Sequence, residues 1–150
     1  TWLVQRSMLT VGLRVKKQMD NADKLARALE KDPHVIKVNY PTVEKYPQKE
    51  LAKKLFKNSN MCGAMLSFEM PSDREKINEF MKRLNICHYA PTLGGVRTTM
   101  SHRATSSHRD LPEEMKKALG ITEGLMRISV GIEEPEDLIA DFTQALKAFD

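Results

Sequence analysis

The sequence of 150 residues predicts a two-layer α/β (α+β) domain in which helices cover a sheet of about four strands. Two observations carry this prediction. Apolar residues recur every three or four positions in five stretches, as in amphipathic helices, and four shorter stretches are apolar in alternation or throughout, as in strands. The length fits one domain, since a chain of this size buries roughly two-thirds of its unfolded surface.

The predicted elements of the first half begin with one long helix within residues 1–31. Its apolar residues form a single stripe, which needs a surface on which to lie. Residues 35–40 (VIKVNY) alternate as a strand does, and residues 47–56 return to helical spacing. Residues 64–70 (AMLSFEM) are then predicted as the second strand.

The middle of the chain is less regular. Ser72 is the predicted N-cap of a helix over residues 73–84, because its hydroxyl can accept from the first free amides. Residues 86–90 (ICHYA) predict a short third strand. Residues 91–112 are rich in Gly, Ser, Thr and His, and loops of this length are usually functional or disordered.

The last part returns to regular structure. Pro112 opens a short helix that Gly120 closes, which is the usual placement of these two residue types. Residues 125–132 (LMRISVGI) are the fourth predicted strand, and Pro135 lies in the first turn of the last helix. The alternation of strands and helices would by itself suggest a parallel sheet, but the pattern establishes only the two layers.

Composition excludes several protein classes. The 24 basic residues exceed the 20 acidic ones by four, but they are mixed with acids, and aromatic residues make up only 6%, so a nucleic-acid-binding stripe is not indicated. Cys62 and Cys87 match neither zinc nor disulfide spacing, which favours reduced thiols in the cytoplasm. We expect no membrane association, because no run approaches about 18 apolar residues.

Arg127 is the unusual residue of the last strand. Alternation places it with Ser129 on the face opposite Met126 and Ile128. Two interpretations remain open from the residues alone. Arg127 is either an ordinary charge on a half-exposed sheet face or the receiver of an anion, because a guanidinium offers a planar fork of donors that matches a carboxylate.

Other motifs are weaker. The glycines of residues 93–95 (LGG) indicate a tight turn, because the other glycines and the lysine of a phosphate loop are missing. His88, His102 and the histidine of residues 106–108 match no metal-ligand spacing. The Ser-Ser-His run at 106–108 lacks the elbow and acid partner of a hydrolase triad.

Several segments together resemble the C-terminal part of the Cys/Met-metabolism family of pyridoxal-phosphate enzymes, which includes cystathionine synthases and lyases and methionine gamma-lyase. Residues 1–41 resemble the helix leading out of the family's cofactor domain and the next strand, and residues 59–70 (SNMCGAMLSFEM) its glycine-containing strand. Residues 91–102 (PTLGGVRTTMSH) resemble the S-L-G-G-x-E-S-L-x-x-H loop. Residues 119–146, with LMRISVG, resemble the closing strand and helix.

This resemblance implies the small C-terminal domain of a fold-type I enzyme, with a mostly antiparallel sheet. Residues 1–31 would link to an N-terminal cofactor domain, and residues 32–150 would bind the substrate carboxylate. By resemblance, Arg127 receives the α-carboxylate of the amino-acid substrate. Thr92 occupies the position of the family's loop serine, which approaches the same carboxylate.

The loop also departs from the family pattern. Leu93, Gly94 and Arg97 are candidates for a substrate loop. Arg97 replaces the family's glutamate, and Arg103 replaces the proline after the loop histidine. Arg97 either favours an acidic distal group on the substrate or simply faces solvent.

The resemblance further implies that the full-length parent is a pyridoxal-phosphate-dependent carbon–sulfur lyase or γ-replacement enzyme acting on cystathionine, methionine or a relative. The chain has no lysine in an S-x-[ST]-K setting, so we expect the cofactor to be bound by a separate N-terminal domain and the 150 residues alone to be inactive. We also expect a cytoplasmic homo-oligomer, a tetramer for the full-length enzyme. Since the sequence starts at Thr1, we expect it to be part of a longer protein.

Two other functions remain open. A free-standing, non-catalytic domain that binds an amino acid for regulation would use the same arginine. An RNA-binding sheet domain follows only from the net charge and the strand content, and it would require strong, salt-dependent binding.

Overall fold

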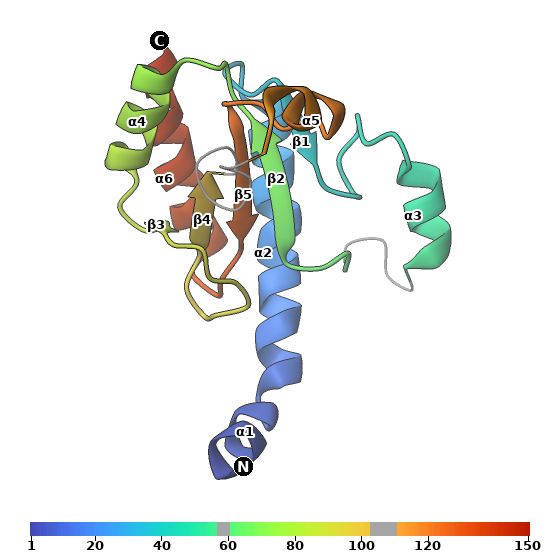
Figure 1. Cartoon of the computed structure of the whole chain (residues 1–150). Coiled ribbons are helices and arrows are strands. Elements are labelled where there is room, and N and C mark those ends of the chain that lie inside the picture. Colours follow the sequence, from blue (N-terminus) through green and yellow to red (C-terminus); the bar gives the residue numbers. More distant parts are fainter. Residues whose placement is uncertain (57–60, 103–110) are drawn as a thin grey trace.

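The computed structural model describes residues 1–56, 61–102 and 111–150, which form one sheet with helices packed against it (Figure 1). The described helices are α1 (Trp2–Met8), α2 (Val11–Lys31), α3 (Lys49–Leu55), α4 (Arg74–Arg83), α5 (Glu113–Ala118) and α6 (Pro135–Leu146), followed by the 3₁₀ turn η1 (Lys147–Phe149). The described strands are β1 (Lys37–Asn39), β2 (Met65–Glu69), β3 (His88–Tyr89), β4 (Thr99–His102) and β5 (Leu125–Ser129). Among the described helices, none combines the length and the apolar character needed to cross a bilayer.

The sheet has five strands in the order β1-β2-β5-β4-β3. The pairs β1–β2, β2–β5 and β4–β5 are antiparallel, and β3 is parallel to β4. The expectation of about four strands is therefore wrong by one strand, and the mostly antiparallel sheet contains one parallel pair. The additional strand, β4, lies within residues 91–112. Met100 is its only apolar residue, so the alternation that marks the other strands is too weak there to be recognised.

The core lies on one face of the sheet, against α2, α4 and α6. Met100, Phe68 and Ile128 project from neighbouring strands and are almost completely buried. The rings of Phe68, Phe80 and Phe142 pack together with centroids 6.1 to 6.2 Å apart. Burying one such side chain contributes about 1.5–3 kcal/mol, so this helix-covered face is the main source of stability.

The predicted long helix is in fact two helices, α1 and α2, separated at Leu9 and Thr10. Thr10 leaves the helical region with φ −111° and ψ 4°. The Arg14 guanidinium donates to the carbonyl oxygen of Ser7 at 2.8 Å and to Thr10 Oγ1 at 3.2 Å, and so satisfies groups that the break exposes. Thr10 and the nearby Gly12 have low helix propensity, which explains why the helix breaks at this point.

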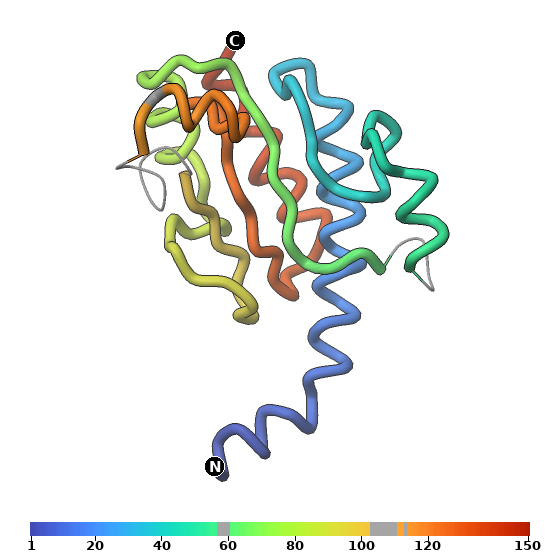
Figure 2. Tube along the Cα trace, turned by 45° about the vertical axis from the view of Figure 1, so that its right-hand side comes forward, coloured from blue at the N-terminus to red at the C-terminus, as the bar shows by residue number. Residues whose placement is uncertain are grey.

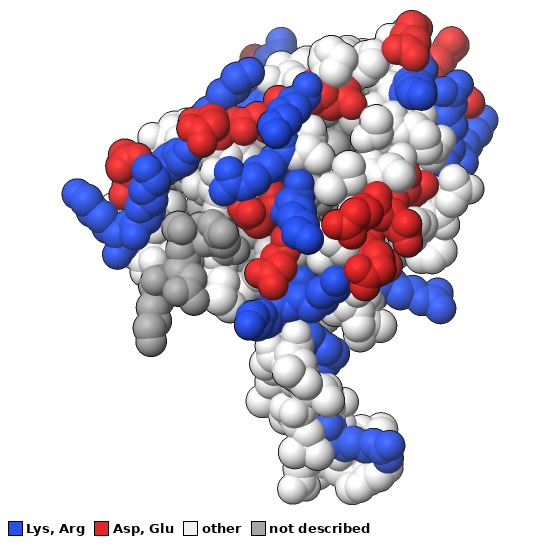
Figure 3. All heavy atoms as spheres, turned by 180° about the vertical axis from the view of Figure 1, so that it is seen from behind, with Lys and Arg blue, Asp and Glu red and all other residues white. Residues whose placement is uncertain are grey.

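The N-terminal part projects from the body of the molecule (Figures 1 and 2). In α1 no residue is buried, and the first buried residue of α2 is Gln18. The exposed large apolar residues of this part are Trp2, Leu3, Val4, Met8, Leu9 and Leu13. Seen from behind, the projection carries few charges, whereas basic and acidic side chains are interspersed over the body (Figure 3). The first half of the predicted apolar stripe therefore has no surface to cover within the described chain.

Three predicted helix ends can be compared with the structure. The N-cap of α4 is Asp73 and not the expected Ser72, because Asp73 Oδ1 accepts from the amides of Glu75 and Lys76 at 3.1 Å each. Gly120 closes α5 with φ +67°, a backbone conformation that favours glycine. Pro135 begins α6 as predicted.

Candidate functional site

The face of the sheet opposite the core, here called the open face, carries a polar row. It crosses four strands in register and consists of Asn39, Ser67, Arg127 and Ser101. The Asn39 amide donates to Ser67 Oγ at 3.1 Å. Arg127 thus lies between Ser67 on one neighbouring strand and Ser101 on the other. It is on the face that the alternation of the last strand predicted.

Arg127 is half-buried, and its guanidinium makes no hydrogen bond or ion pair with any other described residue. Its neighbour Ser101 is 3% exposed, and the Ser101 Oγ atom has no hydrogen-bond partner. A partly desolvated cation gains free energy from an anionic partner, and a buried hydroxyl gains from an acceptor or donor. At the centre of the polar row, the Arg127 guanidinium and the Ser101 hydroxyl are therefore hydrogen-bond donors that no described carboxylate accepts from.

The glycine loop, residues 92–96, is attached to the same face. The Gly94 amide donates to Ser129 Oγ at 2.9 Å, and Ser129 lies two positions after Arg127 on the open face. Gly94 has φ +76°, a conformation that disfavours other residues. The prediction of a tight turn is confirmed, and the turn lies beside the row that contains Arg127.

A second set of contacts holds the end of this loop against the end of β5. Thr98 is fully buried, and its amide and hydroxyl donate to the two carboxylate oxygens of Glu133 at 2.6 and 2.8 Å. The Gly131 amide donates to Thr98 Oγ1 at 2.9 Å. A Cβ atom on Gly131 would collide with the backbone of Val96 and Thr98. This clamp was not predicted, although a glycine after a strand is a signal of close backbone approach.

The structure places the remaining predicted loop residues at the surface. Thr92, Leu93 and Arg97 are exposed. The Thr92 carbonyl accepts from the Thr99 hydroxyl at 3.1 Å, which ties this end of the loop to the open face. Arg97 makes no hydrogen bond or ion pair with the rest of the described chain. Arg103 and residues 106–108 lie outside the described residues.

Histidines and cysteines do not gather into a site in the described part of the chain. His102 is buried with its Nε2 atom 2.6 Å from the carbonyl oxygen of Glu123, whereas His88 is exposed. No three His, Cys, Asp or Glu side chains of the described residues could share a metal ion. Neither Cys62 nor Cys87 forms a disulfide with a described residue. Burial raises the pKa of Cys87 to about 12 and also raises the pKa of Cys62.

The sequence of the whole chain decides the family. The model of the Cys/Met metabolism PLP-dependent enzymes matches residues 1–147. The chain belongs to this family. Among curated members, it is 38% identical over 147 residues to cystathionine beta-lyase of Lactococcus lactis subsp. cremoris (strain MG1363), which covers 98% of the chain and 38% of the relative. It is 39% identical over 145 residues to L-methionine gamma-lyase of Treponema denticola, covering 97% and 35%.

Solved structures of Cys/Met metabolism enzymes share the fold. One from Campylobacter jejuni, described as an O-acetylhomoserine (thiol)-lyase and containing N'-pyridoxyl-lysine-5'-monophosphate, matches with a TM-score of 0.89 at 34% identity over 97% of this chain and 34% of that one. Cystathionine gamma synthase from Xanthomonas oryzae pv. oryzae, in complex with aminoacrylate and cysteine, matches with a TM-score of 0.86 at 33% identity, covering 95% and 36%. The chain therefore spans between a third and two fifths of the length of these relatives.

Pyridoxal phosphate is the cofactor of this family, but the described residues do not form a site for it. Every described lysine is exposed or half-buried, and none belongs to the polar row. In the glycine loop, the Gly94 amide already donates to Ser129 Oγ, so it is not available to bind a phosphate.

Proposed function

We propose that this chain is the C-terminal, substrate-carboxylate-binding domain of a pyridoxal-phosphate-dependent enzyme of sulfur amino-acid metabolism. The observation that carries the proposal is Arg127, which is half-buried in the middle of the polar row without a carboxylate partner among the described residues. The names of its relatives, which include cystathionine lyases and a methionine gamma-lyase, support elimination or replacement at a carbon–sulfur bond.

In this proposal Arg127 binds the substrate α-carboxylate through two parallel hydrogen bonds. Thr92 lies on the loop next to Ser129, and only its carbonyl is engaged by a described residue, so its hydroxyl is available to the same carboxylate. Holding the carboxylate fixes the orientation of the bonds at the α-carbon. Positioning of this kind can supply several of the roughly 7–11 kcal/mol available from orientation. Leu93, Gly94 and Arg97 form the edge of the substrate loop.

Residues 1–31 would join and cover an N-terminal domain that binds pyridoxal phosphate, and residues 32–150 would form the carboxylate-binding domain. The exposed apolar side chains of α1 and the start of α2 support this, because such a surface favours burial against a partner. When bound, pyridoxal phosphate supplies the electron sink for breaking the carbon–sulfur bond. We infer that the chain alone is inactive and that the full-length enzyme is a cytoplasmic homo-oligomer, a tetramer by family resemblance.

The test is Arg127→Lys in the full-length protein. Lysine keeps the charge but loses the two-pronged geometry, and each charge-assisted hydrogen bond is worth about 1.5–3 kcal/mol. We expect kcat/KM to fall about 10- to 100-fold, with the unfolding free energy unchanged within about 0.5 kcal/mol.

Arg74→Lys is the matched control, because Arg74 is an exposed arginine at the start of α4 and belongs neither to the polar row nor to the glycine loop. It should leave kcat/KM unchanged. Equal kcat/KM for Arg127→Lys and the unmodified enzyme would remove Arg127 from the site. The upstream reading frame distinguishes the enzyme from a free-standing regulatory domain. A lysine-bearing cofactor domain in frame supports the enzyme, and a start codon just before Thr1 supports the regulatory domain.

A further inference from the structure

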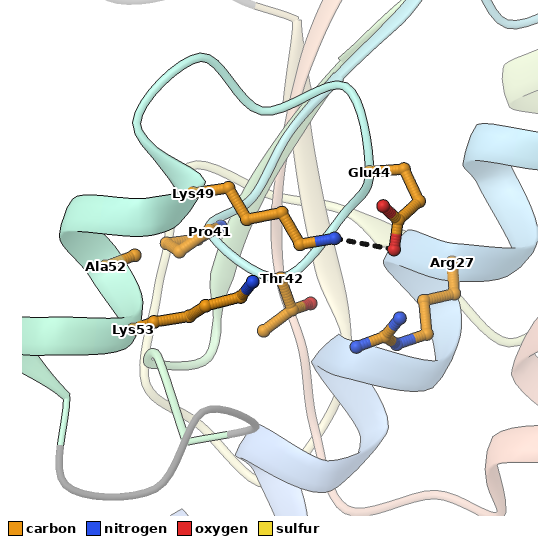
Figure 4. A pocket seen from close by; sticks show the side chains of 7 residues that line it. All are labelled: Arg27, Pro41, Thr42, Glu44, Lys49, Ala52 and Lys53. Atoms are coloured by element: carbon orange, nitrogen blue, oxygen red, sulfur yellow. Dashed lines mark ion pairs between the residues drawn. The ribbon is translucent and has the colours of Figure 1, made fainter.

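A pocket of about 230 Å³ lies between α2, the segment after β1 and α3 (Figure 4). It shares no residue with the polar row or the glycine loop. Its wall is formed by the three cations Arg27, Lys49 and Lys53, the carboxylate Glu44, and the uncharged residues Pro41, Thr42 and Ala52. Three positive charges against one negative charge leave the lining with an excess of two positive charges.

Arg27 has hydrogen-bond donors that no described residue uses. Its Nε atom is shared between the two carboxylate oxygens of Asp23, at 3.1 and 3.0 Å. Its two terminal amino groups have no hydrogen-bond partner within the described chain. Figure 4 shows the guanidinium turned toward Thr42. The hydrogen bond with Asp23, and the charges of Asp23, Glu44 and Glu30, raise the pKa of Arg27 despite partial burial, so it remains cationic.

The two lysines are engaged only by exposed carboxylates. Lys49 Nζ pairs with Glu44 at 2.5 Å at the rim of the pocket, and Lys53 Nζ pairs with Glu50 at 2.6 Å on the same helix. The side chains of Glu44 and Glu50 are 75% and 78% exposed. Ion pairs with such exposed partners contribute little and exchange readily. Both lysines can therefore turn toward a ligand at small cost.

Thr42 is a second, independent observation that points to a ligand. It is 5% exposed, and its hydroxyl has no hydrogen-bond partner. Figure 4 shows its side chain between Lys53 and Arg27. A buried hydroxyl without a partner is unfavourable, and a ligand oxygen in the pocket would satisfy it after a short rotation of the side chain.

We propose that this pocket binds the phosphate group of a small phosphate monoester. The Arg27 fork and the Lys53 ammonium supply charged donors, and the Thr42 hydroxyl supplies a neutral one. Guanidinium groups match the geometry of phosphate oxygens, and a phosphate can replace the exposed carboxylates of Glu44 and Glu50 as the partner of the two lysines. Pro41 and Ala52 leave room beside the phosphate for a small organic group.

The experiment is a calorimetric titration of the full-length protein, saturated with pyridoxal phosphate if it binds that cofactor, with inorganic phosphate at constant ionic strength set by KCl. We expect saturable binding that Lys53→Gln weakens about tenfold, since one charge-assisted hydrogen bond is lost. Lys54→Gln is the matched control, because Lys54 is exposed on the same helix and does not line the pocket. Its affinity should equal that of the unmodified protein. Glycerol phosphate should bind at least as tightly as inorganic phosphate if a monoester is the ligand.

A second variant tests the hydroxyl. Thr42→Val keeps the shape of the side chain, so it should weaken phosphate binding several-fold while raising the Tm of the phosphate-free protein, because an unsatisfied hydroxyl is removed. Equal weakening by Lys53→Gln and Lys54→Gln would indicate general attraction to a basic surface and overturn the proposal. Absence of saturable phosphate binding, or tighter binding of succinate than of phosphate, would also overturn it.

Discussion

The two faces of the sheet use the same strands for different purposes. On β2, Phe68 is fully buried beneath the helices, while its neighbour Ser67 is half-buried on the open face. On β5 the same contrast separates Ile128 from Arg127. Because successive residues of a strand point to opposite faces, stability and the proposed ligand contacts are carried by alternate residues. A substitution on one face should therefore leave the property of the other face intact.

The largest expected effect is on the helix-covered face. Phe68→Ala removes a ring that packs against two others, so the unfolding free energy should fall by about 3–5 kcal/mol. Urea denaturation of this variant beside Ser67→Ala gives a direct comparison of adjacent positions. Ser67→Ala loses only the hydrogen bond from Asn39, worth about 1 kcal/mol. Similar losses for both variants would contradict the division between the faces.

Thr98 is expected to violate this division, because its clamp joins the glycine loop to the end of β5. Thr98→Val leaves the Gly131 amide and one Glu133 oxygen unpaired, which should lower the unfolding free energy by about 1–3 kcal/mol. Under the proposed function, it should also raise the KM of the full-length protein for an amino-acid substrate, since the loop lies beside Arg127. Thr143→Val, at an exposed helix position, is the control. A stability loss with unchanged KM would show that the clamp does not position the loop.

A smaller effect concerns a titratable group on the covered side. Burial, reinforced by the charges of Asp141 and Glu133, raises the pKa of Cys87 from 9.0 to about 12. The unfolded thiol ionises above about pH 9 while the folded one stays neutral, so stability is retained below pH 9 and lost as pH rises toward 12. The slope attributable to Cys87 is about 1.4 kcal/mol per pH unit.

Burial also raises the pKa of Tyr40, which adds to the same trend, so the decisive comparison is with Cys87→Ala. This variant should show a shallower fall in the free energy of unfolding between pH 9 and 11, measured by urea denaturation at fixed salt. If the free energy of unfolding falls equally steeply with pH in the variant and in the unmodified protein, Cys87 ionises to the same extent in the folded and unfolded states, and the prediction is wrong.

The covered face was predictable because its residues alternate with polar ones, and the same alternation placed Arg127 opposite Ile128. Strand β4 was not predictable in this way, since Ser101 and His102 are buried polar residues that give no apolar signal. The hydrogen bonds between Thr98 and Glu133 could not be predicted from the sequence either, because they join residues 35 positions apart. Local patterns report which face a residue occupies, whereas partners distant in sequence are determined by tertiary packing.

The smallest effect is expected at Arg97, which directly follows the glycine loop and is exposed. Arg97→Glu reverses a charge that, in water, interacts by only about 1 kcal/mol even at 4 Å and is screened by salt. We expect the relative kcat/KM for cystathionine, methionine and O-acylhomoserine to change less than about threefold. If the preference instead shifts tenfold, and Arg97→Gln gives an intermediate shift that shrinks at high salt, Arg97 reaches the distal group of the substrate. The ligand contacts would then extend beyond the polar row to the residue that follows the glycine loop.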